Sequence, residues 1–517
     1  MSLHGASGAG APLRRHALPA ALALGLLADA LVRAPGRPGL GAAAWALAAI
    51  LVSAWLLGRR AEPSSWETRW CLGGALGFAC ALALRDAPAL AAFGLLSAVL
   101  LLALAAGRGA SAWVGRATPG DLAFAAMRVG ALVAAGPLGW GRAVEGGEVS
   151  ARWRRWAVTL ARGTLLALPA ALLLTTLLAS ADPVFAVLVQ DVVRIDVAAL
   201  IDQAAFALAA AWLAAGYLRA LLVPDAAFVA RLRVPRLALA PAEISVALWT
   251  LNLLFGAFVA VQLRYLFGGA DLVEVTPGLT YAEYARRGFF ELVAAATLVV
   301  PILLIADWAA GGGVGAGDLG SGAASGSGAA ATSARRVLRT TMLVLVGLLL
   351  AVLASAAYRM ALYQQAYGLT ELRLYVSVFI GWLAFVFAWL AYTVRRERRE
   401  RFASGAVVAG LACVGLLHVL NPHAVIARVN LERAVAGAAY DLGYLQSLGA
   451  DAVPTLVAHL HRLPEAERCR VAGLLEARWS GARPGGWRTW NLGDWRARRM
   501  VAAGTQPPGC AAPAGWP

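Results

Sequence analysis

A ladder of charged side chains precedes one apolar run in the second half of the chain. Glu283, Arg287 and Glu291 are spaced four residues apart, so on a helix they share one face. Thr280-x-x-Glu283 is a capping-box pattern, which predicts a helix start there. A charge carried into hydrocarbon costs about 2.5 kcal/mol or more and often marks a proton or substrate path. Glu291 is therefore a candidate site residue, and an ion-paired anchor at the membrane surface is the alternative.

Two further polar segments, 181–202 and 358–373, have a similar mixture of acids, arginines and aromatic residues and could pair with this ladder. If a catalytic acid or base exists, carboxylates such as Asp182 or Glu283 are the candidates. The candidate polar cluster comprises Asp182, Glu283, Arg286, Arg287, Glu291, Arg359, Glu371 and Arg373.

Asp29 and Glu243 are the other charges that fall within or beside apolar runs and merit attention. Glu243 follows Pro241 at an expected helix start, where a carboxylate complements the helix dipole, so a cap is as good an explanation as a function. Asp29 has no such explanation in the sequence.

Several chemistries lack their residues. The chain contains no lysine, which excludes a Walker A site, a Schiff base and a kinase-type ATP site. Gly315-x-Gly317-x-x-Gly320 lies in a glycine-rich stretch without the strand that a dinucleotide fingerprint requires. The close histidine pairs, His418 with His423 and His459 with His461, lack metal-ligand spacing and are interpreted as solvated positions. We expect no cofactor, nucleotide or metal.

The composition indicates a protein surrounded by lipid and not by water. Of 517 residues, 60% are hydrophobic and 14% are charged, whereas soluble domains have roughly 25% charged residues. The fold class predicted is all-α: a polytopic transmembrane helical bundle of about eleven spans, within a range of ten to twelve, with a small helical C-terminal appendage. The spans are predicted at 17–33, 39–58, 70–84, 88–106, 157–181, 203–222, 241–267, 288–308, 338–357, 374–394 and 404–420.

Two segments leave the span count open. The run 121–141 has Arg128 at its centre and Gly136-Pro137 near its end, so it is interpreted as interfacial or re-entrant. The first run could also be a cleaved signal peptide, since it follows Arg14 and Arg15 and contains Ala28-Asp29-Ala30.

Arginine placement predicts the orientation. With the N-terminus in the cytoplasm, twenty-one loop arginines lie inside and eight outside. This places the region after residue 420 outside a bacterial inner membrane. The net charge of +16 is spread over short loops, which favours contact with lipid headgroups over nucleic acid.

The chain divides by composition into five parts. Cys469 and Cys510 lie in the polar C-terminal region and could pair in an oxidising compartment. The parts are a transmembrane block at 1–308, a flexible Gly/Ala/Ser linker at 309–334, a second block at 335–420, a helical region at 421–503 and a disordered tail at 504–517.

A series of short polar sequence motifs after residue 150 resembles, in the same order, a family of bacterial polytopic membrane proteins known as domain of unknown function 4173. That family has no established activity, so the resemblance implies location and fold and transfers no catalytic residue. The residues that carry it are Ala181-Asp182-Pro183-Val184-Phe185, Leu239-x-Pro241-Ala242-Glu243, Gln262-x-x-Tyr265-Leu266-Phe267-Gly268-Gly269, Tyr281-x-x-Tyr284-Ala285-Arg286-Arg287-Gly288-Phe289, Arg359-Met360-x-Leu362-Tyr363-x-x-x-Tyr367-Gly368-Leu369-Thr370, Asn421-Pro422, Arg428-x-Asn430, Asp441-x-x-Tyr444-Leu445 and Trp490-Asn491-Leu492.

Three functions fit the sequence. The favoured one is a non-enzymatic envelope role in which the outer segments and the C-terminal helices bind a protein partner. A transporter or channel would line a path with Glu291, Asp29 and Arg287 and would need a cavity near the midplane. A membrane enzyme would need converging carboxylates at the outer boundary, whereas partner binding predicts a polar network that is closed and paired.

Overall fold

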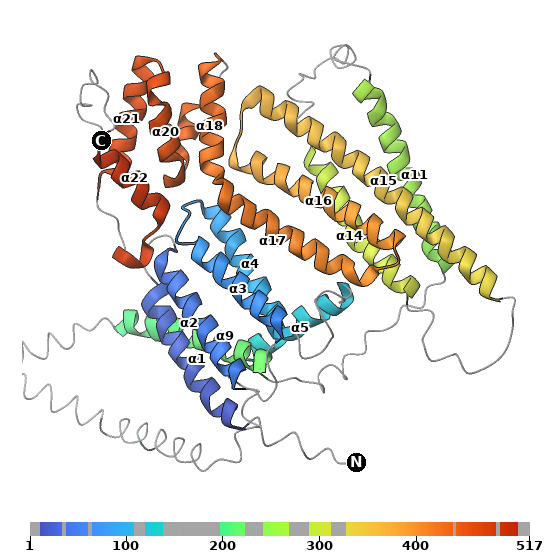
Figure 1. Ribbon diagram of the computed structural model, residues 1–517, viewed down its shortest axis with the longest axis horizontal. Helices are drawn as coiled ribbons and strands as arrows, with labels where there is room; N and C mark the ends of the chain where they lie inside the picture. The colour runs from blue at the N-terminus through green and yellow to red at the C-terminus, as the bar shows by residue number, and fades with distance from the viewer. Residues whose placement is uncertain are drawn as a thin grey trace, which may run out of the picture.

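The computed structural model shows a helical protein (Figure 1). No strand occurs in the part of the chain that it describes. The described stretches are 11–33, 38–59, 65–107, 119–137, 197–222, 241–267, 289–311, 327–437, 441–481 and 486–504, with the isolated residues 159 and 167.

Among the described residues, seven helices are long and apolar enough to cross a membrane. Their outward side chains are apolar too: the exposed fraction is 71% for Leu253 and 75% for Val419. A helix that is apolar all round belongs in hydrocarbon, so the predicted class of helical membrane bundle is confirmed. The seven are α2 (Leu40–Gly58), α4 (Pro88–Ala106), α9 (Val197–Leu222), α11 (Pro241–Phe267), α15 (Ser327–Tyr367), α16 (Glu371–Arg395) and α17 (Phe402–Leu420).

Four further helices accompany them: α1 (Ala11–Val32), α3 (Trp66–Ala81), α5 (Pro119–Ala135) and α14 (Phe289–Gly311). The apolar parts of α1, α5 and α14 are shorter than those of the seven. The predicted span at 70–84 corresponds to α3, a 16-residue helix that rises only about 24 Å at 1.5 Å per residue. The predicted span at 157–181 lies outside the described residues.

The segment interpreted as interfacial or re-entrant forms α5, which packs on α9. Trp212 Nε1 of α9 donates a hydrogen bond to the carbonyl of Ala134 at 2.9 Å. The helix ends beside Gly136, whose φ of +51° and contact with the Trp212 ring leave no room for a side chain. Arg128 is fully buried within the protein.

The predicted linker is helical at both described ends, because α14 continues to Gly311 and α15 begins at Ser327. The alanines at 329–332 are strong helix formers, which accounts for the early start of α15. At its other end α15 continues through the predicted outer segment as far as Tyr367.

The membrane helices form two lobes joined by α17. In the first lobe, α1, α2 and α9 surround Leu56 and Leu218, and α2 to α5 form a second buried cluster with α9. In the second lobe, α11, α14, α15 and α16 surround Leu349 and Phe387. Helix α17 lies between α4 and α16, where Leu417 packs on Ala87 and Leu90 (Figure 1). The first lobe therefore contacts the second along α17, through this apolar packing and through a hydrogen bond from Arg85 Nε to the carbonyl of His418 at 2.7 Å.

A separate helical domain follows α17 and lies at one end of the membrane helices (Figure 1). Pro422 and Pro454 stand in the first turns of their helices, and Pro464 is an N-cap, positions that tolerate the missing amide proton. Its core includes Leu431, Leu445, Leu456, Val471 and Trp479. This C-terminal domain comprises α18 (Pro422–Val435), α19 (Leu442–Ser447), α20 (Val453–His459), α21 (Glu465–Trp479) and α22 (Leu492–Ala502), with short 3₁₀ turns between them.

Candidate functional site: the junction of the C-terminal domain with the membrane helices

The turn between α3 and α4 is the first anchor of the C-terminal domain. Asn491 Nδ2 donates to the carbonyl of Leu82 at 3.0 Å and also to that of Arg85. The next amide, of Leu492, donates to the carbonyl of Ala83 at 2.8 Å. Asn491 Oδ1 meanwhile accepts from the amides of Gly493 and Asp494, so one side chain caps α22 and holds this helix on the end of α3.

Two buried aspartates bind across this contact. The amide of Asp86 donates to Asp451 Oδ2 at 2.6 Å, and Asp86 Oδ2 accepts from the amide of Ala450 at 3.0 Å. The exposed fractions are 8% for Asp86 and 4% for Asp451. Arg85 Nη1 lies 4.0 Å from Asp451 Oδ1. The segments on both sides thus exchange hydrogen bonds with each other's carboxylate.

Burial raises the pKa of Asp451 above its usual value, against the opposing effects of the Asp86 amide and the Arg85 charge. The negative charge of Asp86 raises it further. Two glycines make the close approach possible. A Cβ on Gly449 would lie 3.0 Å from Asp86 Oδ2, and one on Gly493 would lie 2.3 Å from Asp451 Oδ1.

His423, with an exposed fraction of 1%, joins the aspartate pair to α16. Its Nδ1 accepts from the amide of Gly449 at 3.1 Å, so the ring proton is on Nε2. Nε2 then donates to Glu371 Oε1 at 2.6 Å. The amide of Glu371 donates in turn to the Tyr444 hydroxyl at 2.7 Å, and burial raises the pKa of Tyr444.

A third anchor holds the loop between α15 and α16. Asn430 Oδ1 accepts from the Leu369 amide at 2.8 Å, and its Nδ2 donates to the Leu369 carbonyl at 2.7 Å. Gly368, with φ of +76°, turns the chain so that these groups face Asn430. Asn421 caps α18 and donates to the Asp451 carbonyl at 3.1 Å, which links this anchor to the aspartate pair.

Half of the predicted polar cluster lies outside the described residues, namely Asp182, Glu283, Arg286 and Arg287. The other four do not converge on one point. Glu291 is exposed in the first turn of α14, and Glu371 is paired with His423 as described above.

The two predicted cluster arginines have separate tasks. Arg359 is buried and donates to Gln262 Oε1 of α11 at 2.7 Å. Arg373 donates to the carbonyls of Tyr367 and Gly368 at the end of α15 and stacks on the Tyr363 ring at 4.1 Å. Each therefore stabilises a helix contact.

The two predicted intramembrane charges also lie near helix ends. Asp29 Oδ1 accepts from Arg33 Nη1 at 3.2 Å, and Arg33 pairs in addition with Asp202 of α9. Glu243 is exposed in the first turn of α11. Asp29 thus belongs to an ion-paired group that ties α1 to α9.

Sequence reasoning missed most of the junction. The interpretation of His423 as a solvated position was wrong, because the side chain is buried. Asp86 and Asp451 gave no local signal, since 365 positions separate them. A signal did exist for Asn430 and Asn491, because both stand in the short polar motifs that carried the family resemblance. Both bind backbone groups in the turns that connect membrane helices.

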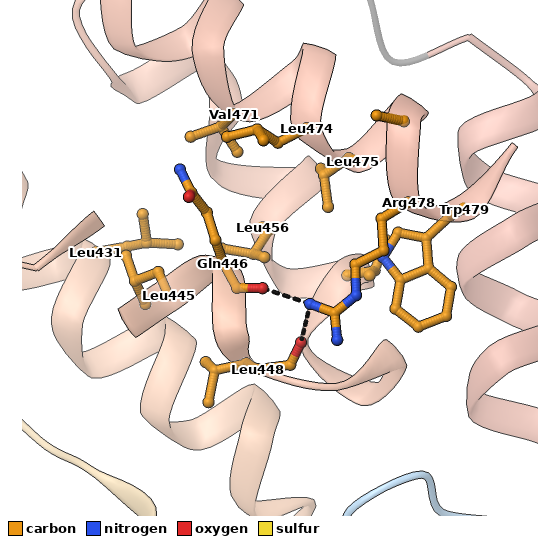
Figure 2. A pocket seen from close by; sticks show the side chains of 12 residues that line it. Leu431, Leu445, Gln446, Leu448, Leu456, Val471, Leu474, Leu475, Arg478 and Trp479 are labelled. Atoms are coloured by element: carbon orange, nitrogen blue, oxygen red, sulfur yellow. Dashed lines mark hydrogen bonds between the residues drawn. The ribbon is translucent and has the colours of Figure 1, made fainter. Parts of the chain in front are cut away.

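The C-terminal domain also contains an apolar pocket of about 270 Å³ (Figure 2). It lies between α18, α19, α20 and α21. Arg478 stands at its mouth, donates to the carbonyls of Gln446 and Leu448, and stacks on the Trp479 ring at 5.2 Å. The apolar lining is formed by Leu431, Leu445, Leu448, Val453, Leu456, Val471, Leu474, Leu475, Ala477 and Trp479.

The described cysteines are one disulfide-bonded residue and three free thiols. Cys469 of α21 is disulfide-bonded, Cys71, Cys80 and Cys413 are free thiols, and Cys510 lies outside the described residues. No group of three or more potential metal ligands occurs in the described part of the chain.

Comparison with known proteins identifies the family but not an activity. No curated protein and no solved structure matches the chain. One family model matches residues 72–315 and 323–459, well over half of the chain. The prediction of an uncharacterised family is confirmed, although its number differs from the predicted 4173. The chain belongs to the family described as Domain of unknown function (DUF4153).

Proposed function

We propose that the chain is a multi-pass protein of the bacterial inner membrane with a non-enzymatic, partner-binding role, and that the C-terminal domain is its binding module. The observation that supports this most is the closed polar junction. Asp86 and Asp451 accept hydrogen bonds from backbone amides and Glu371 accepts one from His423, so these carboxylates hold two parts of the protein together. A general acid or base needs a carboxylate within reach of a substrate.

The same arrangement supports an extracytoplasmic position for the C-terminal domain. The ends of α3, α15 and α17 and the beginnings of α4 and α16 all meet this domain. The arginine bias predicts that these ends share the outer side. A disulfide at Cys469 fits an oxidising compartment. We infer that the N-terminus is cytoplasmic.

A site-specific photo-cross-linker tests partner binding in living cells. Placed at Ala477, which is exposed on α21, it should give one adduct of defined mass; placed at Arg398, which is exposed at the opposite end of the membrane helices, it should not give that adduct. The Asn491→Ala variant, which loosens the domain, should weaken the adduct at Ala477. Adducts of equal pattern at both positions would contradict the proposal.

A flux measurement tests the competing transport function. Purified protein in vesicles should show no proton or solute flux above that of empty vesicles, and Glu291→Gln should change nothing, because Glu291 is exposed in a first helical turn. Flux that the wild type supports and Glu291→Gln abolishes would replace the proposed function with transport.

A further inference from the structure

The pocket of the C-terminal domain combines an apolar interior with a cation at its mouth. Its polar lining residues are Gln446 and Arg478, of which Gln446 is half-buried and Arg478 is exposed (Figure 2). The interior side chains are nearly all buried: the exposed fractions are 1% for Leu445, 5% for Leu456 and 7% for Leu475. An apolar chain that entered such a cavity would remove its own surface from water and would meet no polar partner at depth.

The guanidinium of Arg478 lies against backbone carbonyls at this mouth. Its hydrogen bonds go to the carbonyls of Gln446 and Leu448, which are neutral acceptors. The nearby Arg498, in contrast, binds the carboxylate of Asp494 at 3.0 Å. A guanidinium has five N–H donors in a planar fork, so Arg478 can bind a carboxylate while it keeps both carbonyls.

We propose that this pocket binds a single-chain amphiphile with a carboxylate end, such as a long-chain fatty acid, with the chain inside and the carboxylate on Arg478. The volume of the pocket favours a ligand with one acyl chain over a ligand with two. Small-molecule pockets typically measure roughly 300–1,000 Å³, and about 270 Å³ lies just below that range, which is too little for a two-chain phospholipid. This inference rests on the proposed function and names the ligand class of its binding module.

The shape of the pocket favours an acyl chain over a partner helix. An amphipathic helix needs a groove that is open along several turns. Here Leu431, Val453 and Val471 close the interior, and the exposed lining is limited to Ala477 and Arg478 at the mouth. The domain also rests on the ends of the membrane helices, next to a bilayer that dissolves fatty acids.

The test uses full-length protein in detergent with two photoreactive probes of equal chain length, a diazirine fatty acid and the corresponding fatty alcohol. We expect the acid to label a peptide within residues 442–479, with excess unlabelled fatty acid as competitor. Arg478→Gln should lower labelling by the acid about tenfold, which is the effect of losing one charge-assisted hydrogen bond, and labelling by the alcohol less than twofold. Arg496→Gln, which removes an exposed arginine of α22 away from the pocket, is the matched control and should change neither.

Filling the pocket gives a second readout. Leu474→Trp should abolish labelling of this peptide by both probes, while circular dichroism and retention of the Cys469 disulfide report that the domain is folded. If Leu474→Trp fails to fold, the acid-to-alcohol ratio of Arg478→Gln still decides. Labelling that falls equally for both probes in Arg478→Gln, or label confined to the membrane helices, would overturn the proposal. A protein adduct at Ala477 without fatty-acid labelling would leave partner binding intact and assign the pocket to the partner.

Discussion

Asp86 and Asp451 show what single residues contribute at the junction. Each carboxylate accepts a hydrogen bond from a backbone amide of the segment that carries the other, and both are almost fully buried. Burial of an aspartate costs free energy unless its hydrogen bonds are kept. The pair therefore gives the contact directional specificity, because only the docked arrangement satisfies both groups.

Acidification should strengthen this contact through Asp451. Because the pKa of Asp451 is raised in the folded state, the Asp451 carboxylate binds a proton more tightly in the folded protein than in the unfolded chain. The contribution of Asp451 to the free energy of unfolding should therefore rise as the pH falls from neutral toward the ordinary aspartate pKa of about 4. Arg85, Asp86 and His423 face this group and act on its carboxylate electrostatically.

The difference between wild type and Asp451→Asn isolates the contribution of Asp451 from that of its neighbours. Thermal unfolding of the C-terminal domain in detergent is recorded between pH 7.5 and about 5. As the pH falls, the unfolding temperature of the wild type should rise relative to that of Asp451→Asn. A wild type that loses stability relative to the variant over this range would contradict the raised pKa.

Asn491 should be the most sensitive uncharged position. Asn491→Ala removes two bonds to the turn after α3 and the cap of α22, and we expect a loss of about 2–3 kcal/mol in the free energy of unfolding. Asn491→Asp keeps the oxygen that caps α22 but loses the donor, so it should cost about half as much. Chemical denaturation of the domain measures both. Equal, small effects would mean that the anchor contributes little.

The close packing of the helical elements at the junction depends on glycine as well as on polar side chains. A Cβ on Gly493, in the first turn of α22, would meet Asp451 Oδ1, whereas one on Gly481, just after α21, would meet nothing within 4 Å. The approach of α22 to the 3₁₀ turn at 450–452 thus depends on one missing side chain.

Gly493→Ala should cost about 1–3 kcal/mol, the usual range for an overpacked contact, and should expose the domain to limited proteolysis. Gly481→Ala is the matched control and should stay within about 0.5 kcal/mol of wild type. Equal protease resistance of the two variants would show that α22 can shift without loss.

Helices were predictable from the sequence, but their partners were not. Runs such as 88–106 and 404–420 have to be helical in hydrocarbon because every backbone group must be bonded within the segment. The bounds of a short run were harder to predict: a span was predicted at 70–84, and the helix there begins at Trp66 and ends at Ala81. The contact of Asp86 with Asp451 has no periodic or local signature, so single-sequence reasoning could not find it.

At the scale of the whole molecule, the C-terminal domain connects the two lobes. It binds the first lobe through the turn after α3 and the second through Leu369 and Glu371. Between the lobes themselves the packing around Leu417 is limited. The domain therefore fixes the separation of the lobes at the end where it docks, and any partner bound to it is coupled mechanically to both.

The position of this domain outside the cytoplasm is the central claim, and thiol labelling of intact cells tests it most directly. In a variant with serine at Cys71, Cys80 and Cys413, a membrane-impermeant reductant followed by an impermeant maleimide should label Cys469. Arg398→Cys in the same background should be labelled only after the cells are opened. Labelling of Cys469 only in opened cells, with Arg398→Cys reactive from outside, would contradict the account.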